Sequence, residues 1–349
     1  MSDTIPESNT GKGELTDLFS RTISYLRLSL TDRCNLRCLY CVTEEERNGL
    51  LAKLAPGELL SYEELLRIVA VAVDMGISKV RLTGGEPLVR KGVMEFITRL
   101  AAIDGLNDIR LTTNAVLLAG YAEDLKRAGV TKVNISLDTL RPERFRKITG
   151  CDRFREVWES IERVVELGFS PVKVNMVVMR GINDDELVDF ARLSLELPLQ
   201  IRFIEFMPIG TSSSRQRDTY MSADEMKLKI GEIGSLTPVA KARADGPARI
   251  FHFSDGKAEG KLGFISPISH HFCDRCNRLR LTSEGRLRSC LLSDEETDLK
   301  GVLRSGGSDG DIRKTLLAAI HRKPKGHRMA AGPGKRGGDC HGRMSRIGG

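Results

Sequence analysis

The sequence is poor in aromatic residues and has no long apolar run. Aromatic side chains make up 5% of the 349 residues, with one tryptophan. Proteins that bind single strands of nucleic acid by base stacking need many aromatic side chains, so this composition disfavours that class. No apolar run approaches the roughly 20 residues that cross a membrane. Residues 1–21 resemble neither a secretion signal nor an organelle transit peptide. We therefore expect a cytoplasmic protein with no membrane partner.

Positive charge is concentrated in the last part of the chain. The formal net charge is +7, and residues 321–349 contain eight basic residues and one acidic residue, which accounts for all of it. A basic, glycine-rich tail can bind nucleic acid, remain disordered, or fold onto an anionic substrate. Because the rest of the chain is neutral and adds no positive field, we expect no nucleic-acid partner.

Length and patterning predict one large domain and a smaller one. An apolar content of 40% supports a sizeable core. The regular pattern ends near Met207, beyond which a helix at Ser222–Ile230 and short strands at Arg249–Phe253 and Lys261–Ile265 indicate an α+β unit. The predicted divisions are a flexible N-terminus (1–20), a main domain (21–209), a C-terminal domain (210–325) and a basic tail (326–349).

Short runs rich in Val, Ile and Leu alternate with helical segments between residues 25 and 205. Two of the predicted helices are Ser61–Met75, which opens with a capping box, and Phe154–Leu167. Six such units predict an α/β fold, a parallel sheet curved into a partial (β/α)6 TIM-type barrel with its chemistry at the carboxyl ends of the strands. The predicted strands are Tyr25–Thr31, Lys79–Thr83, Asp108–Thr113, Lys132–Asp138, Val172–Val178 and Gln200–Glu205.

Polar residues alternate with apolar residues along these strands. Thr112, Asn134, Ser136, Lys173 and Arg202 are examples. A strand buried on both faces would not select them, so we expect the inner face of the barrel to be polar and functional.

Six of the eight cysteines form two groups of three. Cys34, Cys38 and Cys41 have the spacing C-x3-C-x2-C, and the second group is Cys273, Cys276 and Cys290. This grouping favours metal sites over disulfides. A four-iron cubane normally takes four thiolates, so each group would leave one iron open. A zinc site is the alternative, completed for the second group by His270 or His271.

The other two cysteines fall outside these groups. We interpret Cys151 as incidental and Cys340 as an exposed thiol rather than a further ligand.

Two motifs suggest ligands for the open irons. Gly84-Gly85 follows a predicted strand, where glycines let a ligand lie against bare backbone, although an ordinary turn has the same composition. Arg278 and Arg280 follow Cys276 and would project to the same side of a strand. Two arginines beside an open iron suit an anion such as a triphosphate. We expect the two cysteine groups to face one another across the barrel mouth.

Together these motifs resemble the radical S-adenosylmethionine (SAM) superfamily, and within it the GTP 3′,8-cyclase family of molybdenum cofactor biosynthesis. The resemblance runs from about Leu18 to Cys290 and resumes at the terminal Ile-Gly-Gly. Asn114-Ala115 departs from the usual Asn-Gly of the family, which puts the tightness of that turn in question. The motifs that carry the resemblance lie at residues 25–29, 80–87, 134–138, 172–175, 202–207, 272–280 and 347–349.

The resemblance assigns roles residue by residue. It implies two 4Fe-4S clusters, held by Cys34, Cys38 and Cys41 and by Cys273, Cys276 and Cys290. The implied SAM contacts are Tyr40, Gly85, Ser136 and Met207. The implied GTP contacts are Arg27, Arg81, Thr112, Lys173, Arg278, Leu279 and Arg280. Arg278, Arg280, Gly348 and Gly349 are implied to act directly in catalysis.

The implied activity is that of a lyase. In the family, the first cluster cleaves SAM, and the resulting radical removes hydrogen from C3′ of the GTP ribose. The carbon radical attacks C8, giving 3′,8-cyclo-7,8-dihydro-GTP. The expected partners are a flavodoxin-like low-potential electron donor, the downstream cyclic pyranopterin monophosphate synthase and, as a possibility, a second copy of the chain. A radical SAM enzyme acting on a peptide and a non-catalytic zinc-binding protein remain as alternatives.

Overall fold

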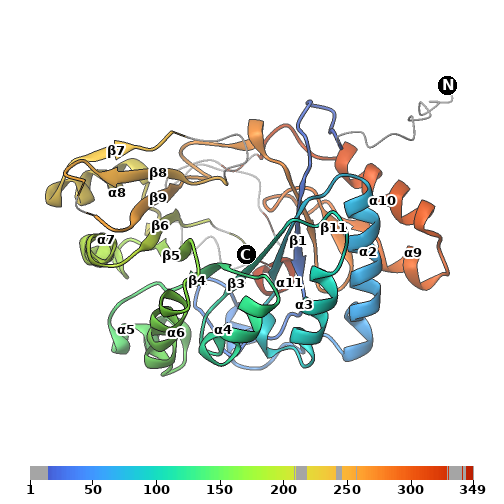
Figure 1. The fold of residues 1–349 in the computed structure, drawn as a ribbon, viewed down its shortest axis with the longest axis horizontal. Helices are drawn as coiled ribbons and strands as arrows, with labels where there is room; N and C mark the ends of the chain where they lie inside the picture. The colour runs from blue at the N-terminus through green and yellow to red at the C-terminus, as the bar shows by residue number, and fades with distance from the viewer. Residues whose placement is uncertain are drawn as a thin grey trace.

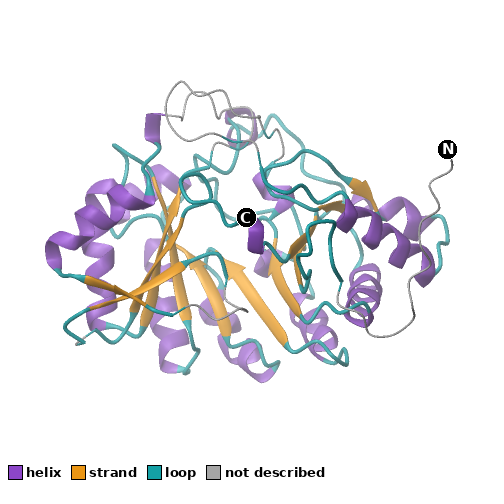
Figure 2. Cartoon of the chain, turned by 90° about the horizontal axis from the view of Figure 1, so that it is seen from above, coloured by secondary structure: helices purple, strands orange, loops and turns teal. Residues whose placement is uncertain are grey.

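In the part of the chain that the structure describes, a twelve-stranded sheet forms the framework. The computed structural model describes residues 15–207, 209, 218–240, 246–256, 258–327, 329, 340 and 343–348. The strand order is β12-β11-β10-β1-β2-β3-β4-β5-β6-β9-β8-β7. Figures 1 and 2 show that the sheet is curved, with helices on its outer side. The expected α/β fold with a partial barrel is confirmed.

The middle of the sheet consists of six parallel strands. Each pairs with the next in chain order, as βα units with right-handed crossovers require. All six predicted strands are present, although β1 and β4 end two residues earlier than expected. The strands are β1 (Tyr25–Ser29), β2 (Lys79–Thr83), β3 (Asp108–Thr113), β4 (Lys132–Ser136), β5 (Val172–Val178) and β6 (Leu199–Glu205).

Helices between the strands cover one face of the sheet. The predicted capping box at Ser61 is formed, since its hydroxyl accepts from Glu64 N at the start of α2. The helices are α1 (Glu44–Arg47), α2 (Tyr62–Asp74), α3 (Val93–Ala101), α4 (Leu118–Arg127), α5 (Pro142–Thr149), α6 (Phe154–Glu166), α7 (Leu187–Glu196), α8 (Ala223–Ile230), α9 (Lys300–Arg304), α10 (Asp309–His321) and α11 (Met344–Ile347). Short 3-10 turns occupy Pro56–Glu58, Pro87–Val89, Asp184–Glu186, Gly231–Ile233 and Cys273–Arg275.

The two faces of the sheet differ sharply in polarity. Leu26 and Leu28 of β1 lie beside Val80 and Leu82 of β2, and all four are fully buried. The intervening Arg27 points to the opposite face, because side chains alternate along a strand. The apolar face packs on the helices and forms the core, which leaves the polar face for the barrel interior.

Strands from the C-terminal part of the chain extend both edges of this sheet. At one edge, β10 (Arg278–Leu281) pairs in parallel with β1, followed by antiparallel β11 (Arg286–Arg288) and β12 (Thr297–Asp298). At the other edge, β9 (Lys261–Ile265) pairs with β6, followed by β8 (Arg249–Phe253) and β7 (Leu236–Pro238). The predicted region 210–325 therefore contributes to the same sheet, and its division from 21–209 stays a prediction. Among the described residues, no helix combines the length and apolar character needed to cross a bilayer.

Candidate functional site

Basic side chains form a row across the inner face of the sheet. Arg280 of β10, Arg27 of β1, Arg81 of β2 and Arg110 of β3 are partners in successive strand registers. Residues paired in this way project to the same face. Lys173 of β5 lies on this face further along the sheet, paired with Asn134. The polar inner face predicted from the sequence is thus present, and it is strongly basic.

The two cysteine groups lie at opposite ends of this interior. Cys34 follows the carboxyl end of β1, whereas Cys276 precedes the amino end of β10, which runs parallel to β1. The four residue steps of β1 alone span roughly 13 Å at about 3.3 Å per residue. The expectation that both groups face one another across the barrel mouth is therefore wrong. Because β1 and β10 are parallel, the residues that follow β1 and the residues that precede β10 lie at opposite ends of the strand pair.

The first cysteine group sits in a buried, acidic setting. The sulfur of Cys34 accepts hydrogen bonds from Leu36 N at 3.4 Å and from Asn114 Nδ2 at 3.5 Å. Burial, assisted by Glu86, raises the pKa of Cys34 to about 11, and burial raises the pKa of Cys41 to about 12. Without metal these thiols hold their protons, and a bound metal would remove them.

The turn that brings Asn114 to Cys34 keeps its shape without glycine. Ala115 adopts a left-handed conformation with φ of 64° and is fully buried. Asn114 Nδ2 also donates to Asn35 Oδ1 at 2.7 Å, which ties this turn to the cysteine loop. Alanine in place of the usual glycine therefore strains the backbone at residue 115 but leaves the turn formed.

The Gly84-Gly85 turn packs against the segment that leads to the first cysteines. A Cβ atom on Gly85 would lie 2.2 Å from Arg33 O, and one on Gly84 would lie 2.6 Å from Thr31 O. The chain's own backbone thus requires both glycines. Glu86 then links this turn to β3, since it accepts from Thr113 Oγ1 at 2.8 Å and from Asn114 N at 2.7 Å. Burial raises the pKa of Glu86 to about 7.

The other predicted SAM contacts lie at the same rim as the first cysteine group. The Tyr40 hydroxyl donates to Asp138 Oδ2 at 2.8 Å, just beyond the end of β4. Ser136 is the last residue of β4, and Met207 lies two residues beyond β6. Tyr40 packs in a small apolar cluster that includes Phe206. The structure brings Tyr40, Gly85, Ser136 and Met207 to one rim.

The predicted GTP contacts line the basic interior. Arg81 donates through Nε to the Tyr25 hydroxyl and through Nη1 to Thr112 Oγ1 at 3.1 Å. Burial, with Arg202 nearby, lowers the pKa of Lys173 to about 6. The Leu279 side chain is the exception, because it lies on the apolar face beside Leu26 and is 2% exposed. A contact between this residue and a substrate can come from its backbone.

The second cysteine group has basic neighbours. Burial would raise the pKa of Cys276, but Arg278 and Lys323 outweigh it and lower the pKa to about 6. The buried Arg21 donates to Cys273 O at 2.7 Å. Arg21 and Lys323 were not predicted from the sequence. Both are far from the cysteines along the chain and belong to no local motif, so no sequence signal could have identified them.

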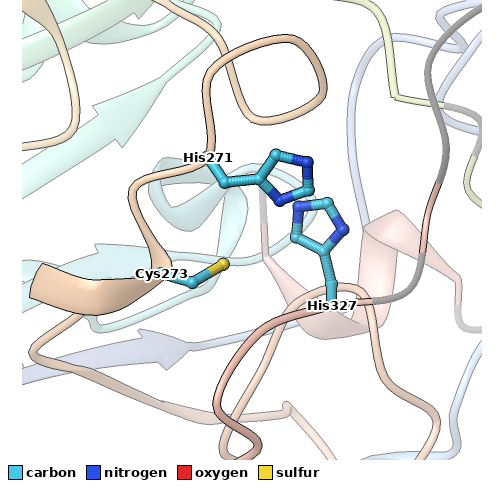
Figure 3. A group of neighbouring side chains, drawn as sticks. All are labelled: His271, Cys273 and His327. Atoms are coloured by element: carbon cyan, nitrogen blue, oxygen red, sulfur yellow. The ribbon is translucent and has the colours of Figure 1, made fainter.

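Cys273 also neighbours two histidines, shown in Figure 3. Among the described residues, His271, Cys273 and His327 form the one group of three whose ligand atoms all lie within 4.8 Å. The two imidazole rings stack 4.2 Å apart, which points their in-plane lone pairs side by side and not at one ion. His327 Nε2 is bonded to Pro267 O at 2.8 Å, and Nδ1 accepts from Met329 N at 3.2 Å. His270 instead pairs with Asp224 at 2.7 Å. These histidines do not build a closed zinc site.

Both cysteine groups fit a cubane cluster. Within the described residues, neither group of three cysteines has its sulfur atoms close enough together to hold a single metal ion. Each group of three thiols would leave one iron of a cubane open. The first group has N–H donors to sulfur, and the second has buried cations that would balance an anionic cluster.

The described part of the tail enters the basic interior. Arg280 Nη1 donates to Gly348 O at 2.7 Å. Gly348 has φ of +76°, and a Cβ atom there would lie 2.1 Å from Thr83 Oγ1. Figure 1 shows α11 inside the curve of the sheet. Gly348 thus touches the end of β2 and a predicted substrate arginine at once. Gly349 lies outside the described residues.

The two remaining cysteines, Cys340 and Cys151, are buried and half-buried respectively. The expectation of an exposed Cys340 is wrong, since this residue is 1% exposed. Its sulfur lies 3.6 Å from Arg288 Nη2 and 3.5 Å from Asp294 Oδ1, so tertiary contacts cover this thiol. Cys151 is half-buried, with its thiol 3.5 Å from Asn35 O beside the first cysteine loop.

Comparisons with known proteins agree with this geometry. The model of the radical SAM superfamily matches residues 28–194, and that of Molybdenum Cofactor Synthesis C matches residues 199–329. The GTP 3′,8-cyclase of Thermodesulfovibrio yellowstonii is 51% identical over 313 residues, covering 89% of this chain and 95% of the relative. The GTP 3′,8-cyclase of Heliobacterium modesticaldum is 49% identical over 336 residues, covering 96% and 100%.

A solved structure supports the fold. The crystal structure of Streptococcus suis SuiB bound to S-adenosylmethionine has a TM-score of 0.59 and 14% identity, and the alignment covers 87% of this chain and 72% of that one. This likeness concerns the fold alone. The identity and coverage of the curated relatives decide the family: the chain belongs to the GTP 3′,8-cyclase family within the radical SAM superfamily.

Proposed function

We propose that this protein converts GTP to 3′,8-cyclo-7,8-dihydro-GTP, the first step of molybdenum cofactor biosynthesis. The observation that carries the proposal is the arrangement of two three-cysteine groups at opposite ends of one interior lined by arginines in register. Such an interior suits a long, highly charged substrate whose two ends require different partners. The curated relatives, at about half identity over nearly their full length, support the same activity.

The first site would hold a cluster and SAM at the rim. Cys34, Cys38 and Cys41 would ligate three irons and leave the fourth open. Tyr40, Gly85, Ser136 and Met207 would position SAM. Clusters and SAM supply the radical chemistry when bound, while the protein binds, orients and shields.

The second site would hold the other cluster and the substrate. Cys273, Cys276 and Cys290 would ligate the cluster at the opposite end of the interior, beside Arg278. The inner-face cations Arg27, Arg81 and Lys173 would neutralise the triphosphate, and Thr112 keeps Arg81 in place. Arg280 would contact GTP as well as the tail. Gly348 and Gly349 would enclose the reacting atoms and exclude water.

The proposal includes partners and location. We propose a low-potential, flavodoxin-like electron donor, a cyclic pyranopterin monophosphate synthase that consumes the product, and a cytoplasmic location. A homodimer is a further possibility. We also propose the division into a main domain at 21–209, a C-terminal domain at 210–325 and a tail at 326–349.

One anaerobic experiment tests the activity. Reconstituted, reduced protein is incubated with SAM and GTP, and the products are separated. We expect 5′-deoxyadenosine together with a cyclised nucleotide, and about seven to eight irons with as many sulfides per chain, as two cubanes require. One or two zincs without sulfide would contradict the enzyme and favour a zinc-binding protein. SAM cleavage stimulated by a peptide but not by GTP would favour the peptide-modifying alternative.

A further inference from the structure

Lys323 joins the two chain segments that carry the second cysteine group. It lies just after α10, is 3% exposed, and donates through Nζ to Arg278 O at 2.8 Å and to Ser289 O at 2.5 Å. Arg278 lies two residues after Cys276, and Ser289 immediately precedes Cys290. The ammonium group therefore fixes the separation of two cysteine-bearing segments.

The charge of Lys323 has no carboxylate partner. In the ranges that the structure describes, this residue forms no ion pair, and the groups that face it are the thiols of Cys276 and Cys290 and the guanidinium of Arg21. Arg21 is already paired with Asp17 at 2.5 Å. A buried ammonium group is costly unless negative charge faces it, and here the cysteine sulfurs are the groups that supply that charge.

The second cluster would be that anion. A cubane held by three thiolates is negatively charged, and one-electron reduction adds a further negative charge. A fixed cation close to two of its three ligands favours the reduced state, because the attraction grows with the negative charge on the cluster.

The first cysteine group has the opposite environment. The acidic residues Glu86, Asp138 and Glu46 raise the pKa values of its thiols, whereas Lys53 and Arg47 act in the opposite direction. Asp138 and Glu86 are 6% and 1% exposed, so solvent screens them little. Where these two carboxyl groups are ionised, their negative charge disfavours reduction of a cluster at that end.

We propose that Lys323 is a positioning residue for the second cluster, and that its ammonium group holds the reduction potential of this cluster above that of the first cluster. The inference rests on the proposed function, since it requires both clusters. It assigns to Lys323 a role in distributing electrons between the two ends of the interior, separate from the substrate contacts of Arg278 and Arg280.

Three substitutions separate charge from structure. Lys323→Gln removes the charge but keeps an N–H donor, Lys323→Arg keeps both, and Lys323→Met removes both. Lys126→Gln is the matched control, because Lys126 Nζ also donates to a backbone carbonyl, Leu167 O at 2.7 Å, on the exposed surface. Each variant is reconstituted anaerobically, assayed for iron and sulfide, and titrated reductively with EPR detection of each cluster.

We expect the Gln and Met variants to retain full iron while the second cluster becomes harder to reduce. At a fixed solution potential, the ratio of reduced to oxidised second cluster should fall about tenfold. This fall corresponds to a reduction potential lower by about 59 mV for a one-electron couple. The first cluster, the Arg variant and the Lys126 control should not shift. An unchanged second-cluster potential in the Gln variant with full iron would overturn the inference while leaving the cyclase proposal intact. Wild-type protein without a second cluster would instead remove the proposed function.

Discussion

Arg280 Nη1 donates a 2.7 Å hydrogen bond to the carbonyl oxygen of Gly348. This bond joins the tail to β10, the strand that follows Cys273 and Cys276, more than sixty residues earlier in the chain. On its other side Gly348 lies against Thr83, at the end of the strand that leads into the Gly84-Gly85 turn. One small residue therefore contacts the proposed substrate end and the proposed SAM end of the interior, and we expect any side chain there to displace one of them.

Gly348→Ala is expected to abolish most of the cyclase activity without unfolding the protein. The added Cβ would lie 2.1 Å from Thr83 Oγ1, and φ of +76° disfavours an L side chain. Displacing a positioning group by about 1 Å can cost roughly 100-fold in rate. The measurement is kcat with GTP beside the thermal unfolding midpoint. Gly57→Ala is the control, because nothing lies within 4 Å of that Cβ position. Full activity in Gly348→Ala would refute the contact.

Arg278→Ala and Arg280→Ala are expected to uncouple SAM cleavage from cyclisation. Both residues lie on the inner face beside Tyr25 and Arg27, away from the first cysteine group. Removing either charge should leave reductive SAM cleavage possible and weaken productive GTP turnover by about 100-fold, as loss of a charged substrate contact predicts. Parallel assays of 5′-deoxyadenosine and cyclised nucleotide test this. Normal cyclase activity in both variants would remove them from the substrate site.

GTP binding is expected to bring a proton onto Lys173. Burial, with Arg202 and Arg110 nearby, lowers the pKa of this lysine to about 6, so it is neutral at pH 7.5 before substrate arrives. A triphosphate nearby favours the charged form, so the pKa rises and one proton is taken up. Calorimetry in buffers of different ionisation enthalpy should report an uptake approaching one proton. The uptake should vanish in Lys173→Met and persist in Lys126→Met.

Ala115→Gly is expected to stabilise the protein slightly. Ala115 has φ of 64°, a conformation that costs an L residue roughly 1–2 kcal/mol and costs glycine almost nothing. Glycine offsets part of this gain through its greater freedom in the unfolded chain, by about 0.4–1 kcal/mol. The unfolding free energy from denaturant titration should therefore rise by up to about 1 kcal/mol. A clear loss of stability would show that burial of the Ala115 methyl group outweighs the strain.

Local pattern was sufficient for the strands and for the first cysteine group. Alternation of polar and apolar residues places Arg27 and Arg81 on one face regardless of what lies opposite, because side chains alternate in any strand. The capping box at Ser61 is equally local. Right-handed crossovers fix the order of strands in a parallel sheet. The residues at the carboxyl ends of the first six strands could therefore be predicted to share one rim.

The pairing of strands that lie far apart in the chain could not be predicted from the sequence. Nothing near Arg278 indicates that its strand joins β1, more than 240 residues earlier, and this pairing alone places the second cysteine group at the far end of the interior. The burial of Cys340 beside Arg288 depends on a tail contact of the same kind. The local composition predicted an exposed Cys340, because composition carries no information about a contact with a residue about fifty positions away.

Tyr25→Phe is expected to flatten the pH dependence of GTP binding above pH 8. The Tyr25 hydroxyl accepts from Arg81 Nε, and Arg27, Lys79 and Arg278 also face this ring. Burial would raise its pKa, but the arginines outweigh burial and lower the pKa to about 8. Above that pH the phenolate cancels one positive charge in a pocket that must hold a polyanion.

The sign of this effect follows from the charge. In wild-type protein, GTP affinity should fall about three- to tenfold more between pH 8 and 9 than in Tyr25→Phe, because the phenolate opposes the triphosphate. The proton taken up by Lys173 affects both proteins alike and cancels in the comparison. Calorimetric Kd values at pH 7, 8 and 9 provide the test. Parallel pH profiles for the two proteins would show that Tyr25 stays neutral and serves only to hold Arg81 in place.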